Sequence, residues 1–182
     1  MKKISLKKNK KKGFTLIETL IAITILMISV AAPLSLASKG LQAANLAKNQ
    51  IVAYYLAQDA YEWVKNKTDM NKAMLKTYAE NGIVNGFDKC INNSCIIDTI
   101  KSPTDSSAIK RYTGQFLKKN NSTKIYSYSS GNNSIFKRYV KIDKVRDDGS
   151  SIDEVSVKVT VEWNVPYTGT QKYVLTGHIS NW

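Results

Sequence analysis

The stretch FTLIETLIAITILMISVAAPLSLAS, residues 14–38, decides the fold of this chain. It contains one charged side chain, Glu18, in 25 residues. A helix of that length is about 37 Å long, enough to cross a bilayer hydrocarbon core of about 30 Å. We therefore expect a membrane-spanning helix here. Pro33 has no backbone N–H, so we also expect a kink or a local loosening of the helix at that position.

The segment before this stretch is strongly basic. Residues 1–13 contain seven lysines and no acidic side chain, and the whole chain of 182 residues has a formal net charge of +13. The remaining residues carry 20 basic and 14 acidic side chains, so much of the net charge lies in this leader. A basic flank on one side of an apolar run predicts a cytoplasmic N-terminus and an exported C-terminal part.

The helical pattern continues through residues 39–66. Apolar residues recur there at spacings of three and four, which predicts an amphipathic helix with one packing stripe. We predict that this stripe consists of Leu41, Ala44, Ala47, Ile51, Tyr54, Ala57, Tyr61 and Val64. One helix is therefore expected from about Phe14 to about Asn66, apolar on all sides in its first half and amphipathic in its second.

Residues 67–106 form a variable region, with a short second helix predicted within 67–82. Cys90 and Cys95 lie in the sequence CINNSC, a spacing that allows a small disulfide loop. An exported chain would favour the disulfide, and a pair of buried free thiols is the alternative. A zinc site would need a second ligand pair, and the single histidine, His178, is far away in the sequence.

In residues 107–182 the apolar pattern changes to a period of two, which predicts strands. The alternation is clearest in 153–165, where Val155, Val157, Val159, Val161 and Trp163 share one face. Further strands are predicted within 108–119, 122–130, 134–145 and 171–182. Short connections favour an antiparallel meander. We expect this sheet head to pack on the amphipathic half of the helix, which makes the fold class α+β.

The sequence offers few groups for catalysis, so we expect neither enzyme activity nor a cofactor. A set of basic and aromatic residues could instead stack on bases and contact phosphates. It comprises Lys124, Tyr126, Tyr128, Lys137, Arg138 and Tyr139. Such residues at alternating strand positions are more commonly core on one face and solvated surface on the other. DNA binding by the head is therefore the alternative function, ranked below a structural one.

Glu18 needs an explanation, because a carboxylate at the centre of a bilayer costs roughly 2.5–3.5 kcal/mol. A secretory signal cut after the small residues Ser35-Leu36-Ala37 would remove the apolar run and leave Glu18 without a role. A carboxylate that reaches the headgroups from near the helix end is a second reading. The third is a carboxylate that pairs with a cation.

The residues KGFTLIE, 12–18, resemble the N-terminal motif of bacterial type IV pilins and pseudopilins. That motif has a basic leader, a glycine at the cut, phenylalanine as the first mature residue and glutamate as the fifth. Residues 53–66 are also similar to the amphipathic helix of minor pilins. The resemblance implies cleavage between Gly13 and Phe14 by a prepilin peptidase, and N-methylation of Phe14.

The resemblance further implies that Glu18 is an assembly residue, whose carboxylate neutralises the terminal ammonium of the same or a neighbouring subunit. The expected partners are other pilin subunits through helix–helix packing, the pilus assembly machinery, and membrane lipid before assembly. The expected location is the cytoplasmic membrane with the head outside the cytoplasm, and then the cell surface or a pilus.

Two features leave finer questions open. The cysteine pair is not near the C-terminus, unlike that of typical major pilins, which favours a minor pilin or a pseudopilin of the kind found in type II secretion. An exported protein cut after Ala37, or one left uncut and anchored by its signal, is the remaining alternative.

Overall fold

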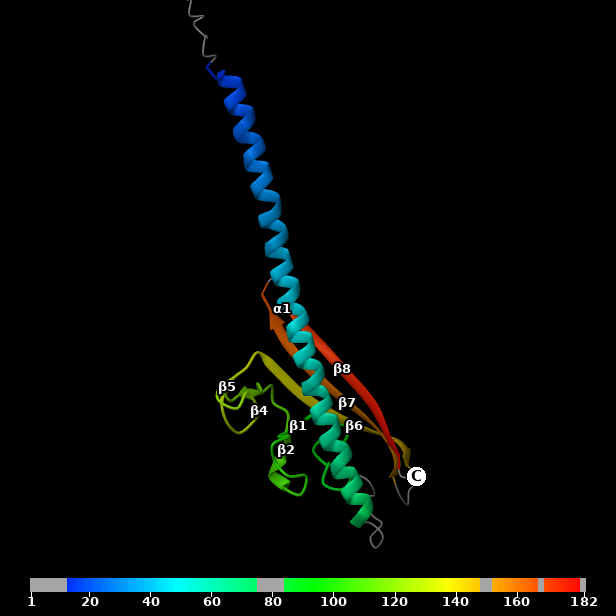
Figure 1. Cartoon of the computed structure of the whole chain (residues 1–182). Coiled ribbons are helices and arrows are strands. Elements are labelled where there is room, and N and C mark those ends of the chain that lie inside the picture. Colours follow the sequence, from blue (N-terminus) through cyan, green and yellow to red (C-terminus); the bar gives the residue numbers. More distant parts are fainter. Residues whose placement is uncertain (1–12, 75–83, 148–151, 167–168, 181–182) are drawn as a thin grey trace, which may run out of the picture. The chain divides into compact units, whose positions relative to one another are not determined.

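The computed structural model describes residues 13–74, 84–147, 152–166 and 169–180. The chain divides into two compact units, residues 1–45 and residues 46–182. The long helix α1 (Leu16–Met74) contributes to both. The second unit contains an antiparallel sheet and the later part of α1 (Figure 1), so the expected α+β fold class is confirmed.

Helix α1 extends further along the chain than the sequence pattern indicated. Lys67 to Met74, predicted as the start of a separate helix, continue α1, and residues 75–82 of that prediction lie outside the described residues. Pro33 lies within α1, which is helical on both sides of it. The expected kink at Pro33 stays a prediction.

The main sheet has five strands in the order β2-β1-β6-β7-β8, all paired antiparallel. The strands are β1 (Cys95–Ile97), β2 (Ile109–Arg111), β6 (Phe136–Asp147), β7 (Ile152–Val165) and β8 (Gly169–Ser180). The predicted meander of the last three strands is confirmed. Strand β1 was not predicted, because three residues are too few to show an alternation, and all three are buried.

A second, small sheet has the order β4-β3-β5. Its strands, β3 (Lys118–Lys119), β4 (Tyr126–Ser127) and β5 (Asn132–Asn133), have two residues each. The prediction of strands within 108–119 and 122–130 was right in part. Residues 109–111 form β2 of the main sheet, but β2 pairs with β1 instead of extending the meander, and 118–119 and 126–127 belong to the small sheet. Residues 118–133 are rich in lysine, asparagine and serine and supply too few apolar side chains to cover a sheet face.

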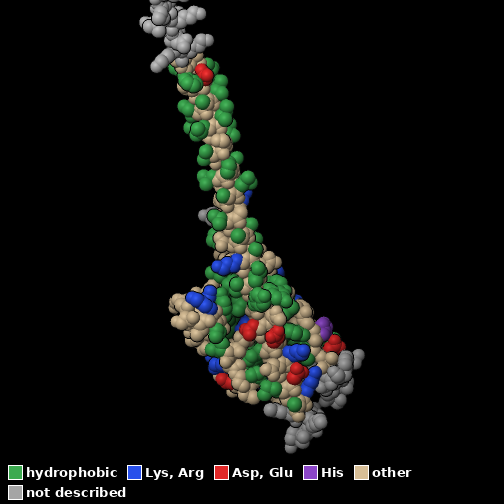
Figure 2. Space-filling model, viewed as in Figure 1, with side chains coloured by type: hydrophobic (Ala, Val, Ile, Leu, Met, Phe, Trp, Pro, Cys, Tyr) green, Lys and Arg blue, Asp and Glu red, His purple; other side chains and the backbone are tan. Residues whose placement is uncertain are grey.

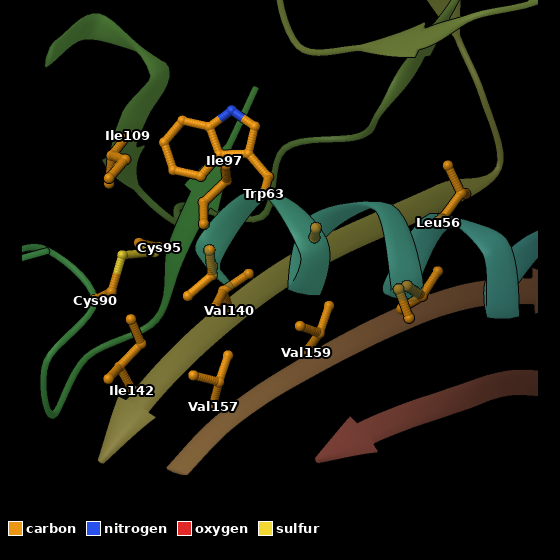
Figure 3. Close-up of a cluster of buried hydrophobic side chains, with 14 of the residues drawn as sticks. Leu56, Trp63, Cys90, Cys95, Ile97, Ile109, Val140, Ile142, Val157 and Val159 are labelled. Atoms are coloured by element: carbon orange, nitrogen blue, oxygen red, sulfur yellow. A yellow bond between two sulfur atoms is a disulfide. The ribbon is translucent and has the colours of Figure 1, made fainter. Parts of the chain in front are cut away.

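The core of the second unit lies between α1 and one face of the main sheet (Figure 3). The five alternating residues of β7, from Val155 to Trp163, are all at most 4% exposed, as their pattern predicted. On α1 the buried stripe consists of Ala53, Leu56, Ala57, Ala60, Trp63 and Val64. The three alanines on this stripe allow the helix to lie close to the sheet.

The predicted helix stripe was wrong in part. Ala57 and Val64 are buried, but Ile51 is 57% exposed and Tyr54 is 44% exposed. The buried stripe is therefore rotated around the helix from the predicted one. Alanine allows this, because a sequence pattern cannot tell whether an alanine lies in a core or at a surface.

Strand β8 is in close contact with α1 at Gly177. A Cβ atom at this position would lie 2.5 Å from the Tyr61 ring, closer than real Cβ contacts. The Tyr61 hydroxyl also donates a hydrogen bond to the carbonyl of His178, with an O···O distance of 3.4 Å. The missing side chain of Gly177 thus makes room for the tyrosine that links helix and strand.

Candidate functional site

The peptide bond between Gly13 and Phe14 lies just before α1, whose first residue is Leu16. Both residues are exposed, Phe14 to 78%, and no atom lies within 4 Å of the place where a Gly13 Cβ would be. A peptidase needs an exposed, non-helical segment to bind a scissile bond. This segment has both properties.

Thr15 caps the start of the helix, and sequence reasoning missed it. The Glu18 N–H donates to Thr15 Oγ1 at 3.3 Å, and the Thr19 N–H donates to the Thr15 carbonyl at 3.2 Å. Thr15 and Glu18 have the spacing of a capping box, a signal visible in the sequence as T-x-x-E before an apolar run. The partial positive charge of the helix N-terminus also favours a carboxylate at Glu18.

The first unit is an apolar helix that no other part of its unit covers. Every described residue from 13 to 45 is exposed, and the large hydrophobic side chains between Phe14 and Leu36 are 53–81% exposed (Figure 2). The helix is long and apolar enough to cross a membrane. Together with the pilin-like motif, this surface indicates membrane anchoring.

Three hydroxyl groups within the apolar half of α1 donate hydrogen bonds to the helix itself. Thr19, Thr24 and Ser29 each donate to the carbonyl three residues earlier, with O···O distances of 2.8 Å. A hydroxyl that entered hydrocarbon without a partner would cost several kcal/mol. These three residues therefore do not oppose insertion into a bilayer.

Cys90 and Cys95 form a disulfide, which excludes the alternative of free thiols. Both are fully buried, and Cys95 is the first residue of β1, where it pairs with Val140 of β6. The carbonyl of Cys90 accepts a hydrogen bond from the Ile142 N–H at 2.9 Å. The disulfide therefore holds the turn before β1 against the centre of the sheet.

Arg138 lies on the core face of β6 and is 1% exposed. Its Nη1 donates to the Leu56 carbonyl at 2.8 Å and to Asp59 Oδ2 at 2.9 Å. Its Nη2 donates to the Ile97 carbonyl at 2.9 Å. One side chain thus joins α1, β1 and β6. Its only carboxylate partner in these contacts, Asp59, has a side chain that is 52% exposed.

The six residues considered for DNA stacking do not form one surface. Arg138 is buried, and the Tyr128 hydroxyl donates to the Arg138 carbonyl. Burial raises the pKa of Tyr128 to about 12. Tyr139 donates to Glu162 Oε1 at 2.8 Å and stacks on Tyr112. Three of the six side chains therefore hold the head together, and the arrangement does not favour DNA binding.

Nothing in the described part of the chain groups three or more histidine, cysteine or acidic residues in a way that could hold a metal ion. The features that point to a function are therefore the exposed Gly13-Phe14 bond, the capped helix start with Glu18, and the uncovered apolar helix.

A protein-family model matches the N-terminal part of the chain. The prokaryotic N-terminal methylation motif matches residues 8–32, which include the leader end, Gly13, Phe14 and Glu18. No curated protein and no solved structure is significantly similar to the chain. The motif covers the start of a long apolar helix that is followed by an α+β head. The chain thus carries the N-terminal methylation motif, and this motif supports a similarity to the precursors of type IV pilin-like proteins.

Proposed function

We propose that the chain is a structural subunit of a type IV pilus or pseudopilus, of the minor rather than the major kind. A prepilin peptidase cuts it between Gly13 and Phe14, Phe14 is N-methylated, and the subunit joins a filament through α1. The observation that carries this proposal is the methylation motif at the start of an uncovered apolar helix. The mid-chain disulfide supports a minor subunit, as the resemblance implied.

In this proposal, residues 1–13 are the leader, 14–38 the membrane and assembly segment, and 39–66 the amphipathic half of the helix. Residues 67–106 are the variable region and 107–182 the sheet head. The subunit waits in the cytoplasmic membrane with its head outside the cytoplasm. Lipid covers the apolar helix there, and helices of other subunits replace the lipid in the filament.

The surface of α1 within the second unit supports this packing. Ile51, Tyr54 and Tyr55 are 57%, 44% and 63% exposed. Exposed apolar surface therefore continues on α1 after the membrane segment. A neighbouring pilin helix would bury this surface and gain about 25 cal/mol for each Å² removed from water.

Glu18 is the assembly residue of this proposal. After the cut, the new ammonium of Phe14 lies four residues before Glu18, at the same end of the helix. A subunit that stacks with its ammonium near the Glu18 of its neighbour relieves the cost of a charge in hydrocarbon. Such a pair can specify an axial offset even where it adds little net stability.

Mass spectrometry of the mature N-terminus tests the processing. We expect a methylated Phe14 as the first residue in wild-type cells, and the uncut chain in cells without prepilin peptidase. A mature chain that begins at Ser38 would show removal of the apolar run and would overturn the proposal. A chain that still begins at Met1 would show an uncut signal anchor.

A substitution at Glu18 tests the assembly role. We expect Glu18→Ala to leave membrane insertion intact and to reduce the amount of subunit in sheared filaments. Glu62→Ala, an exposed glutamate on α1 outside the membrane segment, is the matched control and should assemble normally. Normal incorporation of Glu18→Ala would refute the role of the carboxylate.

A further inference from the structure

A cavity of about 450 Å³ lies in the head, between the β1–β2 edge of the main sheet and the small sheet. Ile96 of β1, Lys110 of β2, Lys118 of β3 and Asn133 of β5 all line it. The proposed filament function uses none of these residues. A volume of roughly 300–1,000 Å³ is typical of sites for small organic ligands.

The rim of the cavity is positively charged. Lys101, Lys110 and Lys118 line it. Lys101 Nζ donates to Ser107 Oγ at 2.5 Å and lies 3.7 Å from Asp105 Oδ2. Within the part of the chain that the structure describes, the ammonium groups of Lys110 and Lys118 have no partner. Two cations are therefore available to an anionic group.

The same charge distribution extends around the cavity. Residues 89–142 contain ten basic and two acidic side chains, whereas residues 143–182 contain four basic and six acidic ones. The basic charge of the head is thus concentrated in the part of the sequence that forms this cavity. Long-range attraction brings an anionic ligand toward it.

The cavity also contains a carboxylate, which a site for a simple anion would not have. Asp98 is 5% exposed and lines the cavity. Its Oδ1 accepts a hydrogen bond from the Tyr128 N–H at 3.3 Å. Across residues 13–74, 84–147, 152–166 and 169–180, no partner faces its second oxygen. A ligand that fills this site must therefore donate hydrogen bonds as well as carry negative charge.

An aromatic ring also lines the cavity, beside the lysines and the carboxylate. Phe116 lines the cavity and is 41% exposed. The Lys137 ammonium lies 4.6 Å from its ring centroid but lines a second pocket that shares Phe116, not this cavity. Asn133 and Ser129 add neutral hydrogen-bonding groups. An open aromatic ring offers an apolar platform to a flat, weakly polar face of a ligand.

We propose that this cavity binds an acidic saccharide, a sugar that carries a carboxylate, sulfate or phosphate group. Lys110 and Lys118 bind the acidic group, because charge-assisted hydrogen bonds to such oxygens are the strong ones. Asp98 accepts hydrogen bonds from sugar hydroxyls. Phe116 contacts the apolar face of a sugar ring. The site belongs to the head and does not depend on assembly through α1.

Isothermal titration calorimetry on the full-length chain in phosphatidylcholine nanodiscs tests the proposal, because neither an anionic headgroup nor a sugar detergent then competes. The acidic probes are a hyaluronan tetrasaccharide, 3′-sialyllactose, a sulfated disaccharide and glucose 6-phosphate. Chitotetraose and lactose are the neutral counterparts. Sodium sulfate is the simple anion, and an eight-nucleotide oligothymidylate is the nucleic acid.

We expect saturable binding of at least one acidic saccharide with one site per chain, and no comparable binding of the neutral sugars, sulfate or the oligonucleotide. Lys110→Gln and Lys118→Gln should each weaken that binding roughly ten- to hundredfold. Lys158→Gln, an exposed lysine on β7 outside the cavity, is the matched control and should bind as the wild type does.

Asp98→Asn should lower the affinity for the saccharide and raise the affinity for sulfate, because it removes the repulsion of a bare anion. The proposal fails if none of the acidic saccharides binds, or if the neutral sugars bind as well. It also fails if sulfate or the oligonucleotide binds as tightly as the saccharide, or if the two lysine variants bind normally. Circular dichroism spectra that match the wild type exclude misfolding of the lysine variants.

Discussion

Because Tyr61 contacts Gly177, we predict that Gly177→Ala destabilises the head, although alanine is usually more favourable than glycine within a strand. A methyl group at position 177 would lie 2.5–2.6 Å from three atoms of the Tyr61 side chain, whereas ordinary van der Waals contact begins near 3.4 Å. Gly177→Ala therefore forces the ring to move by about 1 Å, or β8 to shift away from α1. Overpacking of this kind costs about 1–3 kcal/mol.

The backbone entropy of glycine has the opposite effect on the stability change. Glycine within a strand is less favourable than alanine by roughly 0.5–1 kcal/mol, since it loses more backbone freedom on folding. No positive φ is recorded for Gly177, so the backbone itself tolerates alanine. The net expectation for Gly177→Ala is a loss of about 1–2 kcal/mol in the free energy of unfolding.

Removal of the tyrosine ring should reverse the effect. In a Tyr61→Ala background the clash is absent, and Gly177→Ala should stabilise the head by about 0.5 kcal/mol. The double-mutant cycle therefore predicts a coupling of about 2 kcal/mol, within the range for residues in contact. Thr176→Ser, on the exposed face of β8, should change stability by less than about 0.5 kcal/mol.

Urea unfolding of the full-length chain in a non-ionic detergent, followed by tryptophan fluorescence, measures these differences. Trp63 and Trp163 are buried in the core of the second unit and report on its unfolding. Equal effects of Gly177→Ala in the presence and absence of the Tyr61 ring would refute the reasoning. The glycine would then be tolerated rather than required by its neighbour.

Three further predictions concern the stability of the head and use the same assay. Arg138→Met should lower the free energy of unfolding by about 2–4 kcal/mol, because the carbonyls of Leu56 and Ile97 lose a charged donor, whereas Lys158→Met should have little effect. The double variant Cys90→Ala/Cys95→Ala should lose about 2 kcal/mol, the chain-entropy value for so short a loop, and a reductant should then have no additional effect. Because burial raises the pKa of Tyr128 from 10.0 to about 12, the unfolded state loses its proton first as the pH rises. Stability should therefore fall between pH 10 and about pH 12, and the fall should be smaller in Tyr128→Phe; an unchanged fall would show that other groups cause it.

Parts of the fold could be predicted because their hydrophobic patterns fit only one type of secondary structure. The run of alternating valines before Trp163 cannot bury one face unless it forms a strand, and a helix would expose half of them. The apolar run after Phe14 has the length and composition of a membrane helix. In these segments one physical term, the burial of apolar surface, dominates the outcome.

Other parts could not be predicted, since the outcome depends on distant residues. Which face of α1 packs on the sheet depends on alanines, and alanine fits either a core or a surface. Arg138 has the position of a core residue and the charge of a surface residue. The carbonyls of Leu56 and Ile97 and the carboxylate of Asp59, all far from it in sequence, make its burial favourable. Strand β1 likewise exists because β2 and β6 lie on either side of it.

The candidate site shows the same division. The sequence motif alone singles out Gly13, Phe14 and Glu18 as candidates, since their proposed roles depend on their order along the chain. The cap at Thr15 was visible as a spacing but was overlooked, as its role concerns the helix start rather than the cut. The cavity around Asp98 could not be predicted, because four strands from two sheets must meet to form it.

The proposed cut also has an electrostatic consequence that can be tested. Before cleavage, seven lysines precede α1, and each would cost roughly 2.5–3.5 kcal/mol at the centre of a bilayer, so the uncut helix cannot be withdrawn from the membrane. After cleavage only one ammonium remains at that end, near Glu18, and the Thr15 cap still begins the helix. A Gly13→Val substitution separates processing from folding, because a Cβ atom at position 13 would meet no atom within 4 Å. We expect this variant to insert normally, to remain uncut, and to be absent from sheared filaments. Uncut subunits in filaments at wild-type levels would show that leader removal is not what releases the helix.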